Sequence, residues 1–288
     1  MQFELVWDSR CAVGECPVWD AANRRLLFAD IQGKCINVLH VDSGARETWT
    51  LPDIVPSFGV CRSGRLVVAL RRRVVLFDPR SGAVQDLSPP IDEPASTRLN
   101  DGKVGPDGAF WVGSIDEQKD RQPIGALYRV TPDGRMERRA AGYANSNGLA
   151  WSPDGRTMYH SETKSGIIEA WSFDPQSGAM TNQRRLATMT NEQGRPDGAA
   201  VDTDGNYWSA GPSAGCINRL SPSGELLERI LFPVPGPTMP CFADGALFVT
   251  SLRDGKAPEV LQRFPGLGGL FRAETAVAGV PVGVFADS

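Results

Sequence analysis

Hydrophobic and polar positions recur along this chain in a short repeating unit. Each unit has a short apolar strand, a turn usually built on Asp-Gly or Ser-Gly, and a second strand rich in aromatic and β-branched residues. The turn glycines lie about 40 to 50 residues apart, which is the length of a four-stranded propeller blade. The six copies occupy residues 17–30, 59–68, 104–113, 149–159, 200–208 and 240–249.

Most copies are followed by a second hairpin with its own turn. Asp78-Pro79-Arg80-Ser81-Gly82 and Thr131-Pro132-Asp133-Gly134 are examples. Proline presets φ at the second turn position, and glycine accepts the positive φ that ends the turn. Two hairpins make four strands, so we predict an all-β fold, a six-bladed β-propeller forming a single domain over 1–288. A pair of β-sandwiches or a β-helix fits the even repeat less well, and 251–270 is irregular enough for a short helix or a long loop.

A ring of blades must join its first and last sheets, because open strand edges promote aggregation. The apolar N-terminal segment 3–7 and the C-terminal segment 282–285 are natural partners for this closure. We predict that the first strand completes the last blade.

Composition and charge narrow the classes of function. The 288 residues carry a net charge of −4, which gives no basic footprint for a nucleic acid, and Arg71-Arg72-Arg73 is expected at a strand end or surface turn. No apolar span of membrane length and no signal peptide are evident, so we expect a cytoplasmic protein with no membrane partner. The six cysteines form no CxxC pair and are expected to be reduced. Two histidines are too few for a three-histidine zinc site.

Carboxylate and amide side chains recur at one position of the repeat. Propellers bind ligands where the loops entering the innermost strands converge, and just before the apolar strands of four different repeats lie Glu15, Asn100, Asn147 and Asp197. Asn-Gly and Asp-Gly are common turn dipeptides, so each residue alone is weak evidence. Their shared position favours convergence on the ring axis. Oxygen donors with almost no histidine or thiolate nearby suit one divalent metal ion: Ca²⁺, Zn²⁺, Mn²⁺, Mg²⁺ or Fe²⁺.

Four ordered motifs carry a family resemblance over nearly the whole chain. They are Gly-Glu-x-Pro-x-Trp at Gly14, Arg-x-Asn-Asp-Gly-Lys at Arg98, Asn-Gly-Leu-x-Trp-Ser-x-Asp at Asn147 and Pro-Asp-Gly at Pro196. The chain resembles the senescence-marker-protein/gluconolactonase family, which includes regucalcin. The resemblance implies a metal held by Glu15, Asn147 and Asp197, a sugar lactone contacted by Arg98 and Asn100, and a pocket stretch that includes Glu117. One departure is Tyr159-His160-Ser161-Glu162, where relatives often have an aspartate; the longer acid either alters the pocket wall or reaches the surface.

The function expected from these residues is metal-dependent hydrolysis of an aldonolactone, a pentono- or hexonolactone, with Asp197 as the catalytic proton acceptor. Alternatives are a Ca²⁺-binding regulatory propeller without catalysis and a metal-dependent esterase or organophosphate hydrolase. For Arg98, a salt bridge to Asp92 or Glu93 is an alternative role. Arg98 and Arg121 also fit an anionic group on the substrate, or surface and structural roles. We expect a small-molecule sugar lactone as the partner, no nucleic acid, and a monomer or weak homo-oligomer.

Overall fold

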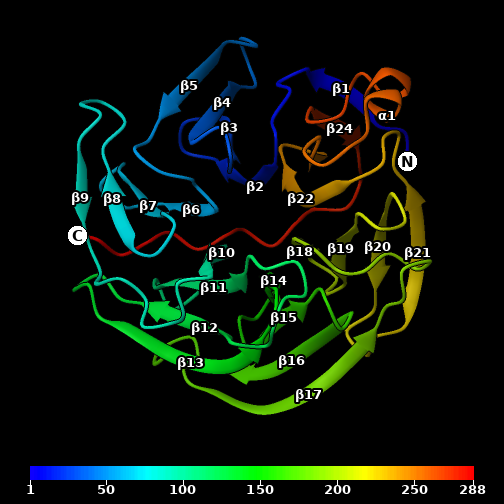
Figure 1. The fold of residues 1–288 in the computed structure, drawn as a ribbon. Helices are drawn as coiled ribbons and strands as arrows, with labels where there is room; N and C mark the ends of the chain where they lie inside the picture. The colour runs from blue at the N-terminus through cyan, green and yellow to red at the C-terminus, as the bar shows by residue number, and fades with distance from the viewer.

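The computed structural model describes residues 1–288 and contains six antiparallel sheets of four strands arranged in a ring (Figure 1). The fold class predicted from the repeats, a six-bladed β-propeller, is confirmed. The first three blades comprise β2 (Gly14–Asp20), β3 (Arg25–Asp30), β4 (Cys35–His40) and β5 (Arg46–Thr50); β6 (Ser57–Val60), β7 (Leu66–Ala69), β8 (Val74–Phe77) and β9 (Val84–Asp86); and β10 (Thr97–Val104), β11 (Phe110–Asp116), β12 (Gly125–Val130) and β13 (Met136–Tyr143). The last three comprise β14 (Ser146–Trp151), β15 (Thr157–Glu162), β16 (Ile167–Phe173) and β17 (Met180–Thr188); β18 (Ala199–Val201), β19 (Tyr207–Gly211), β20 (Cys216–Leu220) and β21 (Leu226–Leu231); and β22 (Pro237–Ala243), β23 (Ala246–Ser251), β24 (Leu270–Glu274) and β1 (Glu4–Trp7).

The first strand closes the ring, as predicted: β1 pairs antiparallel with β24, and Leu5 lies opposite Phe271. The predicted involvement of 282–285 in this closure is wrong. β24 already presents the free edge of the last sheet, whereas the C-terminal segment crosses the ring behind the inner strands (Figure 1). There it satisfies carbonyl groups at the ends of three inner strands, which no neighbouring strand reaches. The donors are the backbone N–H groups of Val280, Gly283 and Phe285, and the acceptors lie at the ends of β18, β10 and β6.

The turns follow the local sequence. The glycines of the predicted hairpin turns, among them Gly82, Gly134 and Gly155, have positive φ, which glycine adopts without a steric penalty. The irregular stretch 251–270 contains one short helix, α1 (Pro258–Arg263). The three arginines 71–73 form the turn between β7 and β8, in agreement with the surface turn expected for them.

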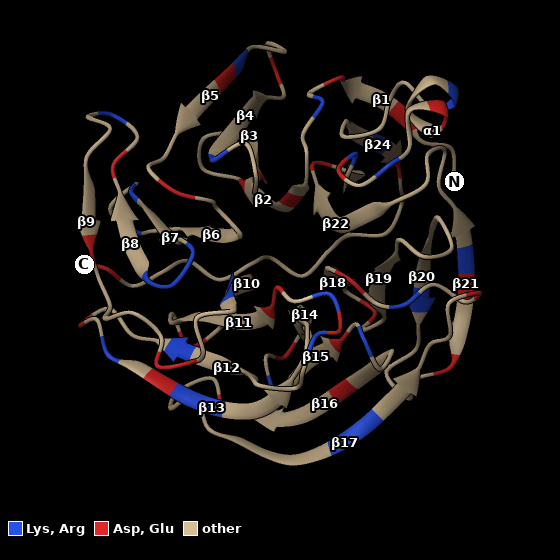
Figure 2. Cartoon of the chain, viewed as in Figure 1, with Lys and Arg blue, Asp and Glu red and all other residues tan.

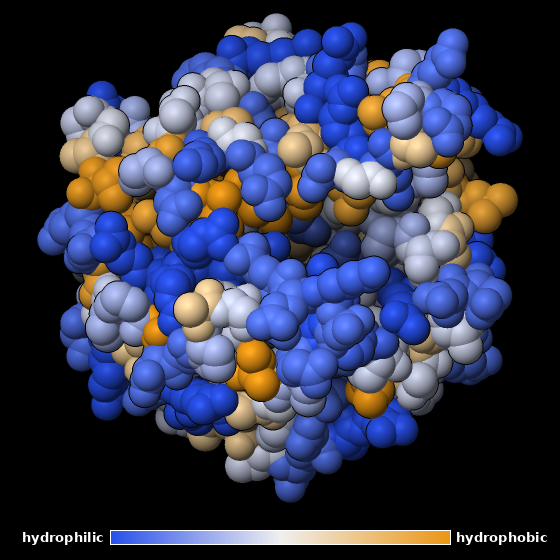
Figure 3. Space-filling model, viewed as in Figure 1, coloured by the Kyte–Doolittle hydropathy of each residue, from blue (hydrophilic) through white to orange (hydrophobic).

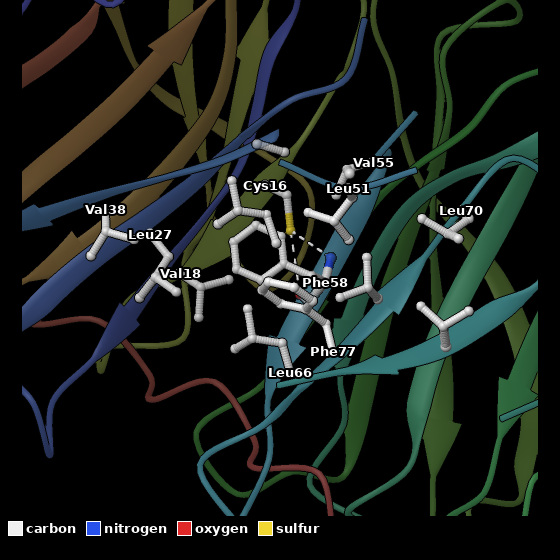
Figure 4. Close-up of a cluster of buried hydrophobic side chains, with 14 residues drawn as sticks. Cys16, Val18, Leu27, Val38, Leu51, Val55, Phe58, Leu66, Leu70 and Phe77 are labelled. Carbon is white, nitrogen blue, oxygen red and sulfur yellow. Dashed lines mark hydrogen bonds between the residues drawn. The ribbon is translucent and has the colours of Figure 1, made fainter. Parts of the chain in front are cut away.

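The hydrophobic core lies between neighbouring blades. Figure 4 shows the cluster between the first two blades, where Cys16 packs against Phe58. The Phe58 backbone N–H donates to the Cys16 sulfur at 3.3 Å, which links β2 to β6. All six cysteines are free thiols, and five are buried, as the absence of CxxC pairs predicted. The hydrophobic clusters between blades hold the inner strands in place and so position the strand ends.

None of the helices has the length and apolar character needed to cross a membrane. Charged residues occur on the outer strands and also at the inner side of the ring, where Figure 2 shows acidic colour on β2 and basic colour on β10. Charges at the inner side are the ones that concern the site.

Candidate functional site

The predicted site residues all line one cavity of about 410 Å³ at the end of the ring where the inner strands begin. Four blades supply them: Glu15 from β2, Arg98 and Asn100 from β10 with Glu117 directly after β11, Asn147 from β14 and Asp197 just before β18. Figure 3 shows a hollow near the centre of the ring with mainly hydrophilic residues around it. The structure therefore brings together residues that are up to 182 positions apart, from Glu15 to Asp197 (197 − 15).

Irregular pairing in the inner strands accompanies the site residues. The register between β2 and β3 shifts after Glu15, and that between β14 and β15 shifts after Asn147. Such bulges re-aim a side chain and are common beside active sites. At the first bulge Cys16 has φ of 49°, an uncommon conformation for a residue other than glycine. The Cys16 backbone N–H donates to Glu15 Oε2 at 2.9 Å, so the strained turn also orients the carboxylate.

Gly148 allows the second bulge. Its φ is +66°, and a Cβ atom at this position would lie 2.2 Å from Tyr207 Oη and 2.4 Å from Ser161 Oγ. The Asn147-Gly148 dipeptide is therefore part of β14 and not a hairpin turn. A glycine is required here because both the backbone conformation and the packing exclude a side chain.

Amide side chains connect blades three and four. Asn100 Nδ2 donates to Asn147 Oδ1 at 3.1 Å and to the Ser146 carbonyl at 2.9 Å. Asn147 Nδ2 donates to Thr163 Oγ1 at 2.7 Å, and Thr163 Oγ1 donates to the Pro196 carbonyl next to Asp197. Because Asn147 Nδ2 donates to Thr163, the amide oxygen Oδ1 is the acceptor end of the side chain, and it has a second lone pair beyond the bond from Asn100.

Arg98 is held by Glu117 and not by Asp92 or Glu93, so the alternative considered for it is wrong. Its Nε donates to Glu117 Oε1 at 3.1 Å, and its Nη1 donates to Asn100 Oδ1 at 2.9 Å. Nη2 has no acceptor in the protein, which leaves one donor for a ligand. Arg71 also pairs with Glu117, from the turn between β7 and β8.

Three carboxylates crowd the inner part of the cavity. Burial raises the pKa of Glu15 well above its usual range, and the charges of Asp197 and Asp101 raise it further. Burial and the charge of Asp101 raise the pKa of Asp197 to about 8. Asp101 Oδ2 accepts the Leu149 N–H at 3.1 Å, whereas its buried Oδ1 has no partner. Like charges brought together in a desolvated site are stabilised by a cation.

A divalent cation fits this donor set. No group of three or more aspartate, glutamate, histidine or cysteine side chains is gathered closely enough to hold a metal ion, so a metal site here would also need an amide oxygen. Glu15, Asn147 and Asp197 provide two carboxylates and one amide, the oxygen donors that hard cations prefer. The unpartnered Asp101 Oδ1 adds a further acceptor at the same end of the channel.

Two buried charged residues at the site were not singled out from the sequence. Asp101 lines the cavity, and Lys103 lies deeper in the same strand with Nζ donating to the Ala199 carbonyl at 2.6 Å. Burial lowers the pKa of Lys103, and the nearby Asp101 charge opposes that shift. Both residues belong to the motif that begins at Arg98, and the available signal was a pair of opposite charges separated only by Gly102 within one strand.

Glu162 lies outside the cavity lining. It is buried and accepts backbone N–H groups of Asn145 at 2.9 Å and Ser165 at 2.6 Å. Of the two positions expected for this longer acid, pocket wall or surface, it takes neither. Its carboxylate satisfies backbone donors at the end of β15, and so supports Asn145 beside the site.

Similarity to known proteins identifies the family of this chain. Residues 13–253 match the family model described as SMP-30/Gluconolactonase/LRE-like region. The chain belongs to this family. It is 35% identical over 277 residues to a 6-deoxy-6-sulfogluconolactonase of Pseudomonas putida, covering 95% of each chain, and 31% identical over 282 residues to Homo sapiens regucalcin, covering 94% of each.

Solved structures show the same fold. A calcium-binding regucalcin from Agrobacterium tumefaciens has a TM-score of 0.92 at 24% identity, with 98% of this chain and 96% of that chain covered. A gluconolactonase from Xanthomonas campestris has a TM-score of 0.74 at 25% identity, with 96% and 89% covered. This gluconolactonase-like family includes relatives that are named as lactonases, and the resemblance inferred from the four motifs is confirmed.

Proposed function

We propose that this protein hydrolyses a sugar-derived aldonolactone, a pentono- or hexonolactone, to the free sugar acid with the help of one divalent metal ion. The observation that carries the proposal is the meeting of Glu15, Asn147 and Asp197 with Arg98 and Asn100 around one cavity. Relatives named sulfogluconolactonase and gluconolactonase support a lactone substrate.

Each side chain has a role that follows from its chemistry. Glu15, Asn147 and Asp197 would hold the ion, whose identity among Ca²⁺, Zn²⁺, Mn²⁺, Mg²⁺ and Fe²⁺ is open. When bound, such an ion stabilises negative charge on the ester carbonyl oxygen and lowers the pKa of a water molecule beside it. Asp197 is the carboxylate that accepts the proton of the attacking water.

Arg98 and Asn100 hold the lactone in place. Arg98 Nη2 has no acceptor in the protein, and Asn100 lines the cavity beside Asn147, to whose Oδ1 it donates. Glu117 fixes the guanidinium of Arg98, and because its side chain is 35% exposed it is also available to a substrate hydroxyl. Polar groups that are fixed in this way orient a polyol with little loss of entropy.

A second candidate is a Ca²⁺-binding regulatory propeller without catalysis, which the relatives named regucalcin favour. An esterase or organophosphate hydrolase is less well supported, because only 4 of the 19 lining residues are hydrophobic. A panel of gluconolactone, galactonolactone, arabinonolactone and xylonolactone with each metal separates these functions. A cytoplasmic location and a monomeric or weakly associated state stay predictions.

The test uses Asp197→Ala and Asn147→Ala. Each variant is expected to lose metal-dependent hydrolysis of the preferred lactone while its circular dichroism stays that of a folded β-protein. Asp204→Ala is the matched control, because it removes an exposed carboxylate that lies outside the cavity lining. Full activity in either site variant contradicts the assignment.

A further inference from the structure

The charges deep in the cavity balance once a divalent ion is bound. Glu15, Asp101 and Asp197 are three carboxylic acids, and Lys103 is the one amine among them; with all four ionised, as metal binding requires of the acids, these deep groups carry a net charge of −2. A divalent ion adds two positive charges. The deep part of the loaded cavity then has no surplus charge, and the charge that a substrate meets is set by the rim.

The rim at the third blade is positively charged. Arg98 and Arg71, which reaches over from the turn between β7 and β8, both form salt bridges with Glu117. Arg121 lines the cavity without a salt bridge of its own, and its charge acts on both Arg98 and Asp197. Asp116 is close by, but it is fully buried and its oxygens accept backbone N–H groups. Even with Asp116 counted, three guanidinium groups against two carboxylates leave one positive charge.

The unused donors point to the same ligand chemistry. Arg98 Nη2 has no protein acceptor, and no side-chain hydrogen bond occupies the guanidinium of Arg121. A guanidinium presents a planar fork of donors that matches the oxygens of phosphate, sulfonate or carboxylate groups. A neutral polyol gains little from a surplus positive charge. Glu117 already offers an acceptor for its hydroxyl groups, and the Asn100 amide is engaged within the protein.

We propose that the third-blade side of the cavity, between Arg98 and Arg121, binds an anionic group carried by the lactone. This proposal rests on the proposed lactonase function and narrows its substrate class to aldonolactones with a phosphate, sulfonate or carboxylate at the end of the sugar chain. The remaining charged lining residue, Asp254, belongs to the last blade on the opposite side of the ring. The Asp254 carboxylate repels an anionic group placed on its side of the cavity. The arginines of the third blade and Asp254 of the last blade therefore favour one orientation of the substrate.

The test compares gluconolactone with gluconolactone 6-phosphate in the metal-loaded protein. We expect kcat/KM to be at least about tenfold higher for the phosphorylated lactone, mostly through KM, because hydrogen bonds between a guanidinium and a phosphate are stronger than those to a neutral hydroxyl. Arg121→Gln is expected to lower the ratio of the two kcat/KM values by about tenfold. Arg185→Gln, which removes an exposed arginine from the outer strand β17, should leave this ratio unchanged. Lactones with a 6-sulfonate or a terminal carboxylate then rank the three anions.

Equal kcat/KM values for the neutral and phosphorylated lactones overturn the proposal, as does an unchanged ratio in Arg121→Gln. If no lactone is hydrolysed with any metal, the proposed function fails instead. Calorimetric titration with the product acids, gluconate and 6-phosphogluconate, then still decides the anion site. Tighter binding of the phosphorylated acid that Arg121→Gln abolishes supports the site, and equal binding of the two acids refutes it.

Discussion

The metal binding proposed for this cavity should depend steeply on pH, because the ion must displace protons from its ligands. In the metal-free protein the pKa of Asp197 is raised to about 8 by burial and by the charge of Asp101, and the pKa of Glu15 is raised as well. At pH 6, two units below that value, only about one molecule in a hundred has Asp197 ionised. The apparent Kd at pH 6 should therefore be about a hundredfold weaker than above pH 8, or about 2.7 kcal/mol at 1.36 kcal/mol per unit.

The raised pKa of Asp197 also determines how the stability of the metal-free protein changes with pH. The folded protein holds the Asp197 proton more tightly than the unfolded chain does, since the usual value for the carboxyl is 3.8. Raising the pH from about 4 to about 8 therefore destabilises the metal-free protein, and added metal should restore the loss. A thermal melt with and without metal at pH 6 and pH 8 measures this difference.

Isothermal titration calorimetry in buffers of different ionisation enthalpy gives both the Kd and the number of protons released. We expect release of about one proton or more at pH 6, with less release above pH 8. Asp197→Asn should bind metal weakly at every pH and lose the part of the pH dependence that Asp197 causes. A Kd that is the same at pH 6 and pH 8, without proton release, refutes the reasoning.

Two further predictions concern the C-terminal segment and the deep carboxylate. Phe285 is fully buried between the second and third blades, so Phe285→Ala should lower the free energy of unfolding by about 3–5 kcal/mol in urea denaturation; an unchanged midpoint would show that the segment does not stabilise the ring. Asp101→Asn keeps an oxygen to accept the Leu149 N–H but removes one negative charge, so metal affinity should fall by about tenfold in calorimetry at pH 8. Affinity equal to that of the wild type would place Asp101 outside the influence of the ion.

The blades and much of the cavity lining could be predicted because their signals are local. Turns such as Asp78 to Gly82 specify hairpins by short-range backbone preferences, and their even spacing gives the number of blades. Glu15, Asn147 and Asp197 share one position in the repeat. Because a ring turns equivalent positions toward one axis, their convergence could be predicted.

Other features depend on contacts that no local pattern specifies. Arg71 belongs to a surface turn by sequence, and only the packing of the second blade beside the third brings it to Glu117. The terminal segments 3–7 and 282–285 are both apolar, so their sequences do not show which of them pairs in the last blade. The free edge of β24 decides this, because it accepts β1. Lys103 resembles an ordinary exposed lysine until the Ala199 carbonyl of another blade is placed next to it.

The most direct test of the account is a crystal of the protein grown with Mn²⁺ and measured for anomalous scattering. We expect one strong anomalous peak in the cavity, within coordination distance of oxygen atoms from Glu15, Asn147 and Asp197. A cavity without a peak, or an ion bound only elsewhere while these three side chains point apart, would contradict the account.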